Sequence, residues 1–458
     1  MKILICGAGQ VGFNIARHLA MEGNDVVVVD QSPDLVRRIN DSLDAQGIVG
    51  HASRPDVLER AGAGDADMLI AVTHTDEVNM VACQVAHSVF EVPMKIARIR
   101  DQSYLDPAWA NLFSREHLPI DVIISPEMEV AKAIARRLRV PGCFEMISLA
   151  EDKVRLLGVR CGANCPLVNT RIRELTQLFP SLNIIIVGML RNEEPIRLTG
   201  DDHILVGDDV YFVVETSQLS RAMAAFGHEE PEARRVLICG GGSIALRLAE
   251  VIEQDFPDVM VKIIEANAER AAAIASMLSG IVVLHGDVLD PQILEEAGVV
   301  TTDTIVAVTD DDETNVLGSL LAKRHGASRA ITLLNKETYE PLVKTLGIDV
   351  IVSPRNITAS TILQHVRRGR IYSVHTLREG FGELIEAEAL ETSSLVGAPL
   401  RDIKLPPGVM VGAIVRNGEF VSPRGATVIQ SKDRVVLFAV SEAVRKVERM
   451  FSVRLEYF

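Results

Sequence analysis

A glycine loop near the start of the chain has the residue types and spacing of a nucleotide phosphate site. Gly7-Ala8-Gly9-Gln10-Val11-Gly12 follows an apolar run at residues 3–6, and Asp30 ends the next apolar run 18 residues after Gly12. In dinucleotide-binding folds the first glycine makes the tight turn, the second lets a pyrophosphate approach the backbone, and the third lets the helix pack close to the strand. The phosphate then meets N–H groups at the helix N-terminus. Loop, strand and acid together predict a nucleotide site, with a tight turn that binds nothing as the alternative.

The acid after the second apolar run selects among nucleotides. Asp30 would accept hydrogen bonds from a ribose and would repel a 2′-phosphate. The first site is therefore predicted to favour NAD or an adenine nucleotide over NADP.

A second glycine loop recurs in the other half of the chain. Gly240-Gly241-Gly242-Ser243-Ile244-Ala245 follows an apolar run at 236–239, and Glu265 comes 20 residues after Ala245. Two of the three key glycines are kept, and alanine in the third place is a tolerated variant of the motif. We expect a second, somewhat different nucleotide site, with a loop that serves only as scaffold as the alternative.

Further candidates lie where other predicted strands end. Arg98 ends a strand expected at 95–99 and would point from the carboxyl edge of the sheet towards the phosphates, where a bidentate donor is useful. A surface ion pair is the other role for this residue, and its counterpart in the second half is Leu333. The remaining candidates are Thr73, His74, Thr309, His51 and Asp287. For Thr73 and Thr309, capping a helix is the alternative role.

No metal site is predicted. The six cysteines contain no Cys-x-x-Cys pair, and Cys161-x-x-x-Cys165 lacks partners at a zinc-like spacing. The 11 histidines are scattered without a His-x-x-x-His pair. Cys6 and Cys239 occupy matching strand ends and are expected to be small core residues.

The elements that position these residues occur twice, because the chain is an internal duplication. Residues 118–126 (LPIDVIISP) return as residues 346–354 (LGIDVIVSP), and 55–62 (PDVLERAG) match 291–298 (PQILEEAG). The offset falls from 236 to 228 between these two matches, so the first copy carries about eight extra residues, which we place near 109–116 as a surface insertion.

Each half is predicted to be a pair of lobes. Runs that are apolar throughout, such as residues 26–29, indicate parallel strands buried on both faces by helices. The fold class is therefore α/β, with two Rossmann-like doubly wound parallel-sheet lobes, each followed by a small α+β lobe. The expected domains are a Rossmann-like lobe at 1–132, a small lobe at 140–226, a linker at 227–233, a second Rossmann-like lobe at 234–360 and a second small lobe at 370–458.

The composition of the chain argues against nucleic-acid binding and against a membrane-spanning protein. The 458 residues carry a net charge of −15 and 4% aromatic residues, which disfavours general nucleic-acid binding. The longest apolar runs stop far short of the ~20 residues that span a bilayer. No signal peptide is visible before the first strand, and the cysteine pattern suits a reducing compartment, so a cytoplasmic location is expected.

The chain resembles the TrkA family of Trk-type potassium uptake regulatory subunits, which are built from tandem RCK (KTN) domains. The features that carry the resemblance are the tandem lobes, the loop at 7–12, Asp30 and the segment Gly50-His-Ala-Ser-Arg-Pro55. The resemblance covers essentially the whole chain. It implies a peripheral protein on the inner face of the cell membrane that binds NAD(H), ATP or ADP. It also implies a ring beneath a membrane-embedded potassium transporter subunit, whose opening the ring controls. The resemblance also implies which residues bind the nucleotides. In the first site they are Gly7 to Val11, Asp30, Thr73, His74 and Arg98, and in the second site they are Gly240 to Ile244, Glu265, Asp287 and Thr309.

Two other functions remain as alternatives. An NAD-dependent oxidoreductase would need a second domain that supplies an acid/base group, and the small lobes of about 85 to 95 residues do not display one. A DNA-binding regulator would need a basic helix-turn-helix segment, which is not evident in the sequence. The chain is therefore not expected to be an enzyme, and a homo-oligomer, most simply a tetramer, is expected from the need to sum binding energies over several chains.

Overall fold

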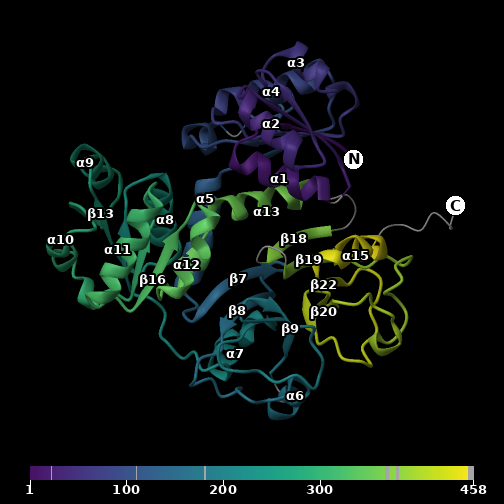
Figure 1. The fold of residues 1–458 in the computed structure, drawn as a ribbon, viewed down its shortest axis with the longest axis vertical. Helices are drawn as coiled ribbons and strands as arrows, with labels where there is room; N and C mark the ends of the chain where they lie inside the picture. Colours follow the sequence, from purple (N-terminus) through teal and green to yellow (C-terminus); the bar gives the residue numbers. More distant parts are fainter. Residues whose placement is uncertain (22, 110, 180–181, 367–370, 378–380, 452–458) are drawn as a thin grey trace. The chain divides into compact units, whose positions relative to one another are not determined.

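The computed structural model describes residues 1–21, 23–109, 111–179, 182–366, 371–377 and 381–451 (Figure 1). The predicted start of the second small lobe at residue 370 and its last seven residues lie outside this described part. Contact density divides the chain into two compact units, residues 1–131 with 353–366, and residues 132–352 with 367–458. Each unit is described by itself below.

The first Rossmann lobe is built on a six-stranded parallel sheet. Its strand order is β3-β2-β1-β4-β5-β6, the doubly wound order in which the chain reverses direction between β1 and β4. The residues of the apolar run at 26–29 are at most 4% exposed, which confirms the predicted burial of both sheet faces. The strands are β1 Lys2–Cys6, β2 Asp25–Asp30, β3 Gln46–Val49, β4 Met68–Ala71, β5 Met94–Arg98 and β6 Val122–Ile124; the helices are α1 Gln10–Met21, α2 Pro33–Ser42, α3 Pro55–Arg60, α4 Asp76–Ser88 and α5 Pro126–Leu138.

The second Rossmann lobe repeats this topology with the order β14-β13-β12-β15-β16-β17. The first copy has 3-10 turns at Gln102–Leu105 and Pro107–Trp109, whereas the second has one 3-10 turn at Glu337–Tyr339 followed by helix α12. The strands are β12 Arg235–Cys239, β13 Met260–Glu265, β14 Val282–His285, β15 Thr304–Ala307, β16 Arg329–Leu333 and β17 Val350–Val352; the helices are α8 Ser243–Asp255, α9 Ala268–Met277, α10 Pro291–Glu296, α11 Asp312–Arg324, α12 Glu340–Thr345 and α13 Pro354–Val366.

The small lobes are antiparallel sheets with the same topology in both copies, β7-β8-β11-β9-β10 and β18-β19-β22-β20-β21. The helix expected near 171–179 is shorter, a 3-10 turn at Ile172–Glu174 followed by α6 Leu175–Leu178. The other elements are β7 Cys143–Leu149, β8 Val154–Arg160, β9 Ile184–Arg191, β10 Glu194–Pro195, β11 Asp209–Glu215 and α7 Leu219–Ala225, then β18 Ile371–Leu377, β19 Gly382–Glu388, β20 Val409–Arg416, β21 Glu419–Val421, β22 Arg434–Ala439 and α15 Val444–Phe451.

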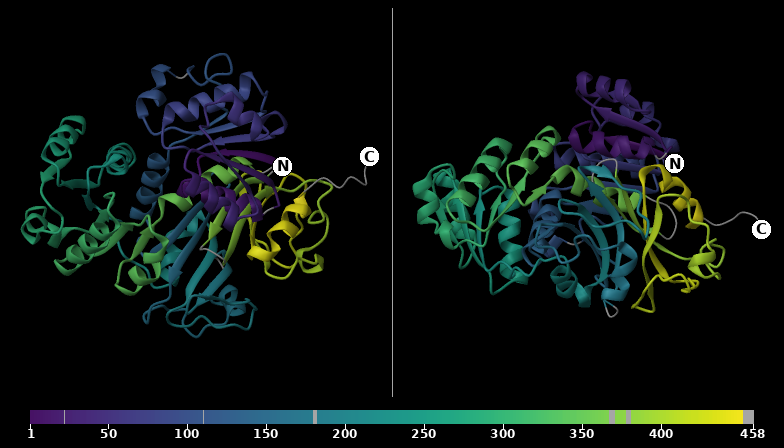
Figure 2. Two further views of the ribbon diagram at one scale, coloured as in Figure 1. Left: turned by 45° about the horizontal axis from the view of Figure 1, so that its top comes forward. Right: turned by 60° about the horizontal axis from the view of Figure 1, so that its bottom comes forward.

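The two small-lobe sheets pack together inside the second unit, as both views of Figure 2 show. The Phe381 ring packs against the rings of Tyr211 and Phe438, with centroids 5.1 Å apart in each case. Close approach depends on glycine, because a Cβ at Gly188 would lie 2.4 Å from the Phe381 ring. The two copies of the small lobe therefore share one apolar core.

Helix α13 belongs to the first unit, although it follows the last strand of the second Rossmann lobe. Ile362 and Leu363 are buried in the same cluster as Ile15 and Leu19 of α1. The first Rossmann core is thus completed by a helix from the other half of the sequence.

Candidate functional site

The first glycine loop lies at the switch point between β1 and β4, where a doubly wound sheet binds its ligand. Gly7 has φ +111°, a conformation that favours glycine, and a Cβ there would lie 3.0 Å from the backbone of Val72 and Thr73. The end of β1 therefore presses directly on the end of β4. This contact leaves no room for a side chain at the turn.

The other two glycines of the loop have different reasons to be glycine. A Cβ at Gly12 would lie 1.8 Å from the carbonyl oxygen of Gly7, so helix α1 could not start so close to the strand with any side chain there. A Cβ at Gly9 would meet nothing within 4 Å, and Gly9 is exposed. Packing therefore does not require glycine at this position, whereas a bare backbone is what close approach of a pyrophosphate requires.

Asp30 lies against the loop, as the spacing predicted. Its carboxylate accepts hydrogen bonds from the N–H groups of Ala8 at 2.7 Å and Ser32 at 2.8 Å. The acid therefore holds the loop and the start of the next turn together at the carboxyl edge of the sheet. A ribose that approached this edge would meet the carboxylate beside the loop.

Arg98 is buried at the same edge, not on the surface in an ion pair. It is 7% exposed, and its guanidinium donates to the carbonyl oxygen of Thr73. Burial, with the nearby Arg100 charge, lowers its pKa to about 10. Within the described residues its Nε has no hydrogen-bond partner. A buried guanidinium with an unused donor, at the same carboxyl edge of the sheet as an open glycine backbone, fits an anionic group such as a phosphate.

Thr73 is held by an asparagine that sequence reasoning did not single out for a role. Asn79 Oδ1 accepts from the Thr73 N–H at 2.8 Å and hydroxyl at 2.7 Å, while its amide donates to the Arg98 carbonyl at 2.9 Å. Asn79 is fully buried and ties the ends of β4 and β5 together. Thr73 does not cap helix α4, whose N-cap residue is Thr75, and the neighbouring His74 is exposed.

The second loop repeats this framework with changed side chains. Gly240 has φ +100° and lies against Thr309, as Gly7 lies against Thr73. Asn315 Oδ1 accepts from the Thr309 N–H at 2.8 Å and hydroxyl at 2.7 Å, and its amide donates to the Leu333 carbonyl. The β15–β16 register pairs Ala307 with Thr332, which confirms Leu333 as the counterpart of Arg98.

The second acid differs from the first in length and in its neighbours. Glu265 accepts from the Gly241 N–H at 2.5 Å, and a Cβ at Gly241 would lie 2.7 Å from the Glu265 carboxylate. Glutamate and glycine therefore replace the aspartate and alanine of the first loop as a matched pair. Arg270, which the motif gave no reason to select, donates to the Gly241 carbonyl at 2.9 Å.

The remaining predicted positions form local turns. Asp287 accepts from the Leu289 N–H at 2.9 Å, and His51 Nδ1 is 2.7 Å from the Ser53 hydroxyl. Both residues follow the third strand of their sheet. Cys6 and Cys239 are fully buried in the cores, as expected. Within the described residues no cluster of three or more ligating side chains could hold a metal ion.

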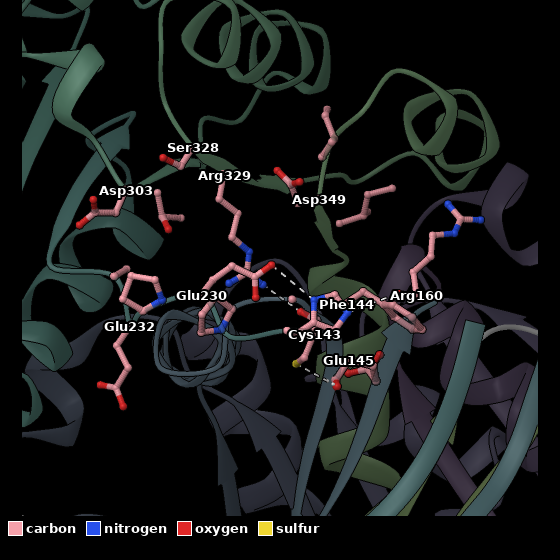
Figure 3. A pocket seen from close by; sticks show the side chains of 18 of the residues that line it. Cys143, Phe144, Glu145, Arg160, Glu230, Glu232, Asp303, Ser328, Arg329 and Asp349 are labelled. Atoms are coloured by element: carbon pink, nitrogen blue, oxygen red, sulfur yellow. Dashed lines mark hydrogen bonds and ion pairs between the residues drawn. The ribbon is translucent and has the colours of Figure 1, made fainter. Parts of the chain in front are cut away.

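The second unit contains a large cavity, and no residue of either glycine loop lines it. It has a volume of about 970 Å³ and is formed in the second unit by the amino ends of β12, β15 and β16, the segment at 228–235 and strand β7. Figure 3 shows Arg329 reaching towards Glu230 and Cys143, and its guanidinium donates to the Cys143 carbonyl at 2.9 Å. Many charges around this cavity pair with each other, as Arg160 does with Asp209 and Arg235 with Asp303. Nucleotide loops open at the carboxyl ends of strands, so this cavity is not the nucleotide site.

Family models match most of the chain. The TrkA-N domain matches residues 3–126 and 236–354, and the TrkA-C domain matches residues 156–227 and 384–452. The chain belongs to the TrkA family. A Trk system potassium uptake protein TrkA from Azorhizobium caulinodans is 53% identical over the full length of both chains, and one from Halomonas elongata is 42% identical, also over the full length of both. These TrkA relatives are named for potassium uptake and not as oxidoreductases, in agreement with the expectation that the chain is not an enzyme.

Solved structures confirm the duplicated RCK fold of this TrkA family member. The GsuK RCK domain aligns over 99% of this chain and 95% of that chain, with a TM-score of 0.61 and 19% identity. A structure of the GsuK channel bound to NAD aligns over 99% of this chain and 79% of that chain, with a TM-score of 0.61 and 18% identity. Within the described residues no helix of this chain is both long enough and apolar enough to span a bilayer.

Proposed function

We propose that this chain is a cytoplasmic regulatory subunit that binds nucleotides and gates a membrane-embedded potassium transporter. Family membership supports the transport role, because the full-length relatives are named as Trk system potassium uptake proteins. The observation that carries the nucleotide role is that one sheet edge has both an open Gly9 backbone after β1 and the buried Arg98 guanidinium, with an unused Nε, at the end of β5.

The proposed ligands are NAD(H) and ATP or ADP, bound at the two glycine loops. Asp30 would accept from ribose hydroxyls, and Arg98 would donate to phosphate oxygens. The GsuK channel, which shares the fold, has been solved with NAD and with ADP bound. The residues assigned to the two sites are Gly7, Ala8, Gly9, Gln10, Val11, Gly12, Asp30, Thr73, His74 and Arg98, then Gly240, Gly241, Gly242, Ser243, Ile244, Glu265, Asp287 and Thr309.

The proposed assembly is a homotetrameric ring on the inner face of the cell membrane. Driving a two-state gate from 1:99 to 99:1 needs ~5.5 kcal/mol of differential binding, whereas one coupled ligand typically contributes ~1 to 3 kcal/mol. Four chains moving together would each need about 1.4 kcal/mol. The proposed moving parts are the four lobes and the linker between the two halves. The Rossmann lobes are 1–132 and 234–360, the small lobes are 140–226 and 370–458, and the linker is 227–233.

Isothermal titration of the full-length protein with NADH, NAD, ATP, ADP and NADPH tests the nucleotide role. We expect micromolar binding at two sites per chain with different ligand preferences and little NADPH binding. Asp30→Ala and Glu265→Ala are matched variants, because each removes the acid of one loop only. Asp30→Ala should also relax the discrimination against NADPH at the first loop. Titration curves that neither variant changes would place the ligand elsewhere.

Potassium flux tests the gating role separately. Vesicles that hold the transporter subunit should take up potassium at a rate that depends on this protein and on which nucleotide is present. Nucleotide binding without any effect on flux would leave the sites intact and overturn the gating proposal. Sedimentation as a monomer at micromolar concentration, with and without nucleotide, would overturn the ring.

A further inference from the structure

The crevices at the two glycine loops differ most in the half that lies over the fourth and fifth strands of each Rossmann sheet. In a doubly wound fold the acid after the second strand binds the adenosine ribose and the glycine loop binds the phosphates, so the rest of the ligand extends over this half. The first copy has His74 after β4 and Arg98 at the end of β5, whereas the second has Asp310 after β15 and Leu333 at the end of β16. The second crevice therefore has a carboxylate and an apolar side chain where the first has an imidazole and a guanidinium.

A second guanidinium of the first copy is also replaced in this half. The buried carboxylates of Asp76 and Asp312 occupy matching places, since each accepts a hydrogen bond at 2.8 Å from the N–H two residues after its fifth strand, that of Arg100 or Asn335. The Arg100 side chain is 40% exposed and lies 3.5 Å from Glu127. The Asn335 amide instead turns back and donates to Asp312 at 3.1 Å. The second copy thus has an uncharged amide in place of this cation.

Carboxylates lie in the same half of the second crevice. Asp310 and Asp311 are exposed, and they stand where the first copy has His74 and Thr75. Asp311 caps helix α11. Asp310 makes no hydrogen bond or ion pair in the part of the chain that the structure describes. A phosphate in this half would therefore meet an unpaired carboxylate.

The cation that follows Asn335 is already paired. The Lys336 ammonium is 2.9 Å from the Glu313 carboxylate and 5.0 Å from the centroid of the Tyr339 ring. The Tyr339 hydroxyl donates to the same carboxylate at 2.7 Å. The charge of Lys336 is thus used within its own turn and does not offset Asp310.

The second copy carries an unpaired cation on the adenosine side of its loop. Gly241 is held by both of its backbone groups, because its N–H donates to Glu265 at 2.5 Å and its carbonyl accepts from Arg270 Nε at 2.9 Å. Arg270 is half-buried, and its two amino groups make no hydrogen bond or ion pair within the described residues. These groups can donate to a phosphate that lies on the loop itself.

We propose that the second loop selects a dinucleotide such as NAD(H) and rejects nucleoside triphosphates, whereas the first loop accepts both; this inference rests on the nucleotide role proposed above. A dinucleotide places its pyrophosphate on the loop, next to Arg270, and its second ribose and nicotinamide ring over Leu333 and Asp310. A triphosphate would place its terminal phosphate in that half, where like charge and the lack of a donor oppose it. In the first crevice Arg98 and Arg100 can donate to the same phosphate.

Matched glycine variants isolate the two loops for the test. A Cβ at Gly9 or at Gly242 would meet nothing within 4 Å, so aspartate fits at either place, and its charge repels a phosphate from that loop alone. Isothermal titration of full-length Gly9→Asp protein therefore reports on the second loop, and titration of Gly242→Asp protein reports on the first. The probes are NAD and magnesium-free ATP, because magnesium would mask the charge of the triphosphate.

We expect the Gly9→Asp protein to bind one NAD per chain and to bind ATP at least about tenfold more weakly. The Gly242→Asp protein should bind NAD and ATP with Kd values within about threefold of each other. Equal NAD and ATP affinities in the Gly9→Asp protein would overturn the selectivity and leave nucleotide binding in place. Wild-type protein that binds neither ligand would overturn the nucleotide role and this inference together.

Exchange of residues between the copies identifies the determinants. Asp310→His and Leu333→Arg, introduced together into the Gly9→Asp protein, install the residues of the first crevice and should strengthen ATP binding about tenfold, with NAD binding changed less than about twofold. Asp310→His alone changes an exposed residue and should strengthen ATP binding about two- to fivefold. Arg270→Leu should weaken NAD and ATP alike, since both place a phosphate on the loop. If neither Asp310→His nor the double change strengthens ATP binding in protein with an unchanged calorimetric midpoint, the proposal is wrong.

Discussion

The two glycine loops share a backbone framework and differ in charge. In both copies a buried asparagine, Asn79 or Asn315, ties the threonine after the fourth strand to the end of the fifth strand. In both copies the acid after the second strand holds the loop by one of its N–H groups. What a duplicated site keeps is therefore the set of bonds that shapes the crevice.

The differences are concentrated where a ligand would make contact. Arg98 of the first copy is Leu333 in the second, and Leu333 is 2% exposed, so the second crevice is apolar at this point. Arg270 lies over the second loop, at a place where the first copy has Leu35. The cations thus sit at opposite ends of the two crevices, one near the fifth strand and one near the acid. We expect the two loops to differ in which part of a nucleotide they bind most strongly.

The largest predicted difference concerns the third glycine. Gly12→Ala gives the first loop the residue of the second, but the new Cβ would lie 1.8 Å from the Gly7 carbonyl. We expect it to cost about 3 kcal/mol, which is about 10 °C in the calorimetric unfolding midpoint of the first unit. The reverse change, Ala245→Gly, should cost only about 1 kcal/mol through lost helix propensity. Equal shifts for the two variants would mean that the loops do not differ in how closely strand and helix pack.

The next comparison exchanges the buried cation. Arg98→Leu should weaken the first site for phosphate-bearing nucleotides about 10- to 100-fold, because hydrogen bonds to charged groups are worth about 1.5 to 3 kcal/mol. The second site should be unaffected. The unfolding free energy of the unliganded protein should not fall, since the variant removes a buried charge with an unused donor. Lost stability together with unchanged titration would instead show that Arg98 is only structural.

The smallest predicted difference lies in the small lobes and depends on pH. Burial, with Arg136 nearby, lowers the pKa of His375 in strand β18 to about 4, and the matching residue of strand β7 is Ile147. The unfolded chain therefore binds a proton that the folded chain does not, between the ordinary histidine pKa near 6.5 and pH 4. Stability is complete above pH 6.5 and is lost as the pH falls.

Since the side chain is only partly buried, we expect a loss of about 1 to 2 kcal/mol between pH 8 and pH 5. His375→Ile should remove that loss. Urea unfolding of both proteins at the two pH values measures the difference. If the variant keeps the full acid sensitivity of the wild type, the shift belongs to another group.

The duplicated fold was predictable because its signals are local and periodic. Continuous apolar strands, a glycine loop before a helix and an acid at the end of the next strand each constrain only neighbouring residues. They predicted that Asp30 lies against the loop that begins at Gly7, and the structure shows this contact. The burial of Arg98 and the position of Arg270 could not be foreseen. Both depend on which side chains fold over the loop, and the sequence gives no spacing rule for that.

Helix α13 has a consequence for how this molecule can be made and taken apart. Since this helix completes the core around α1, the amino-terminal half produced alone would expose Ile15 and Leu19 to water. The duplication is therefore no longer a pair of separable modules, even though each half still carries its own loop. A gene divided at the linker would have to express both fragments together, and the fragments would have to find each other before either could fold completely.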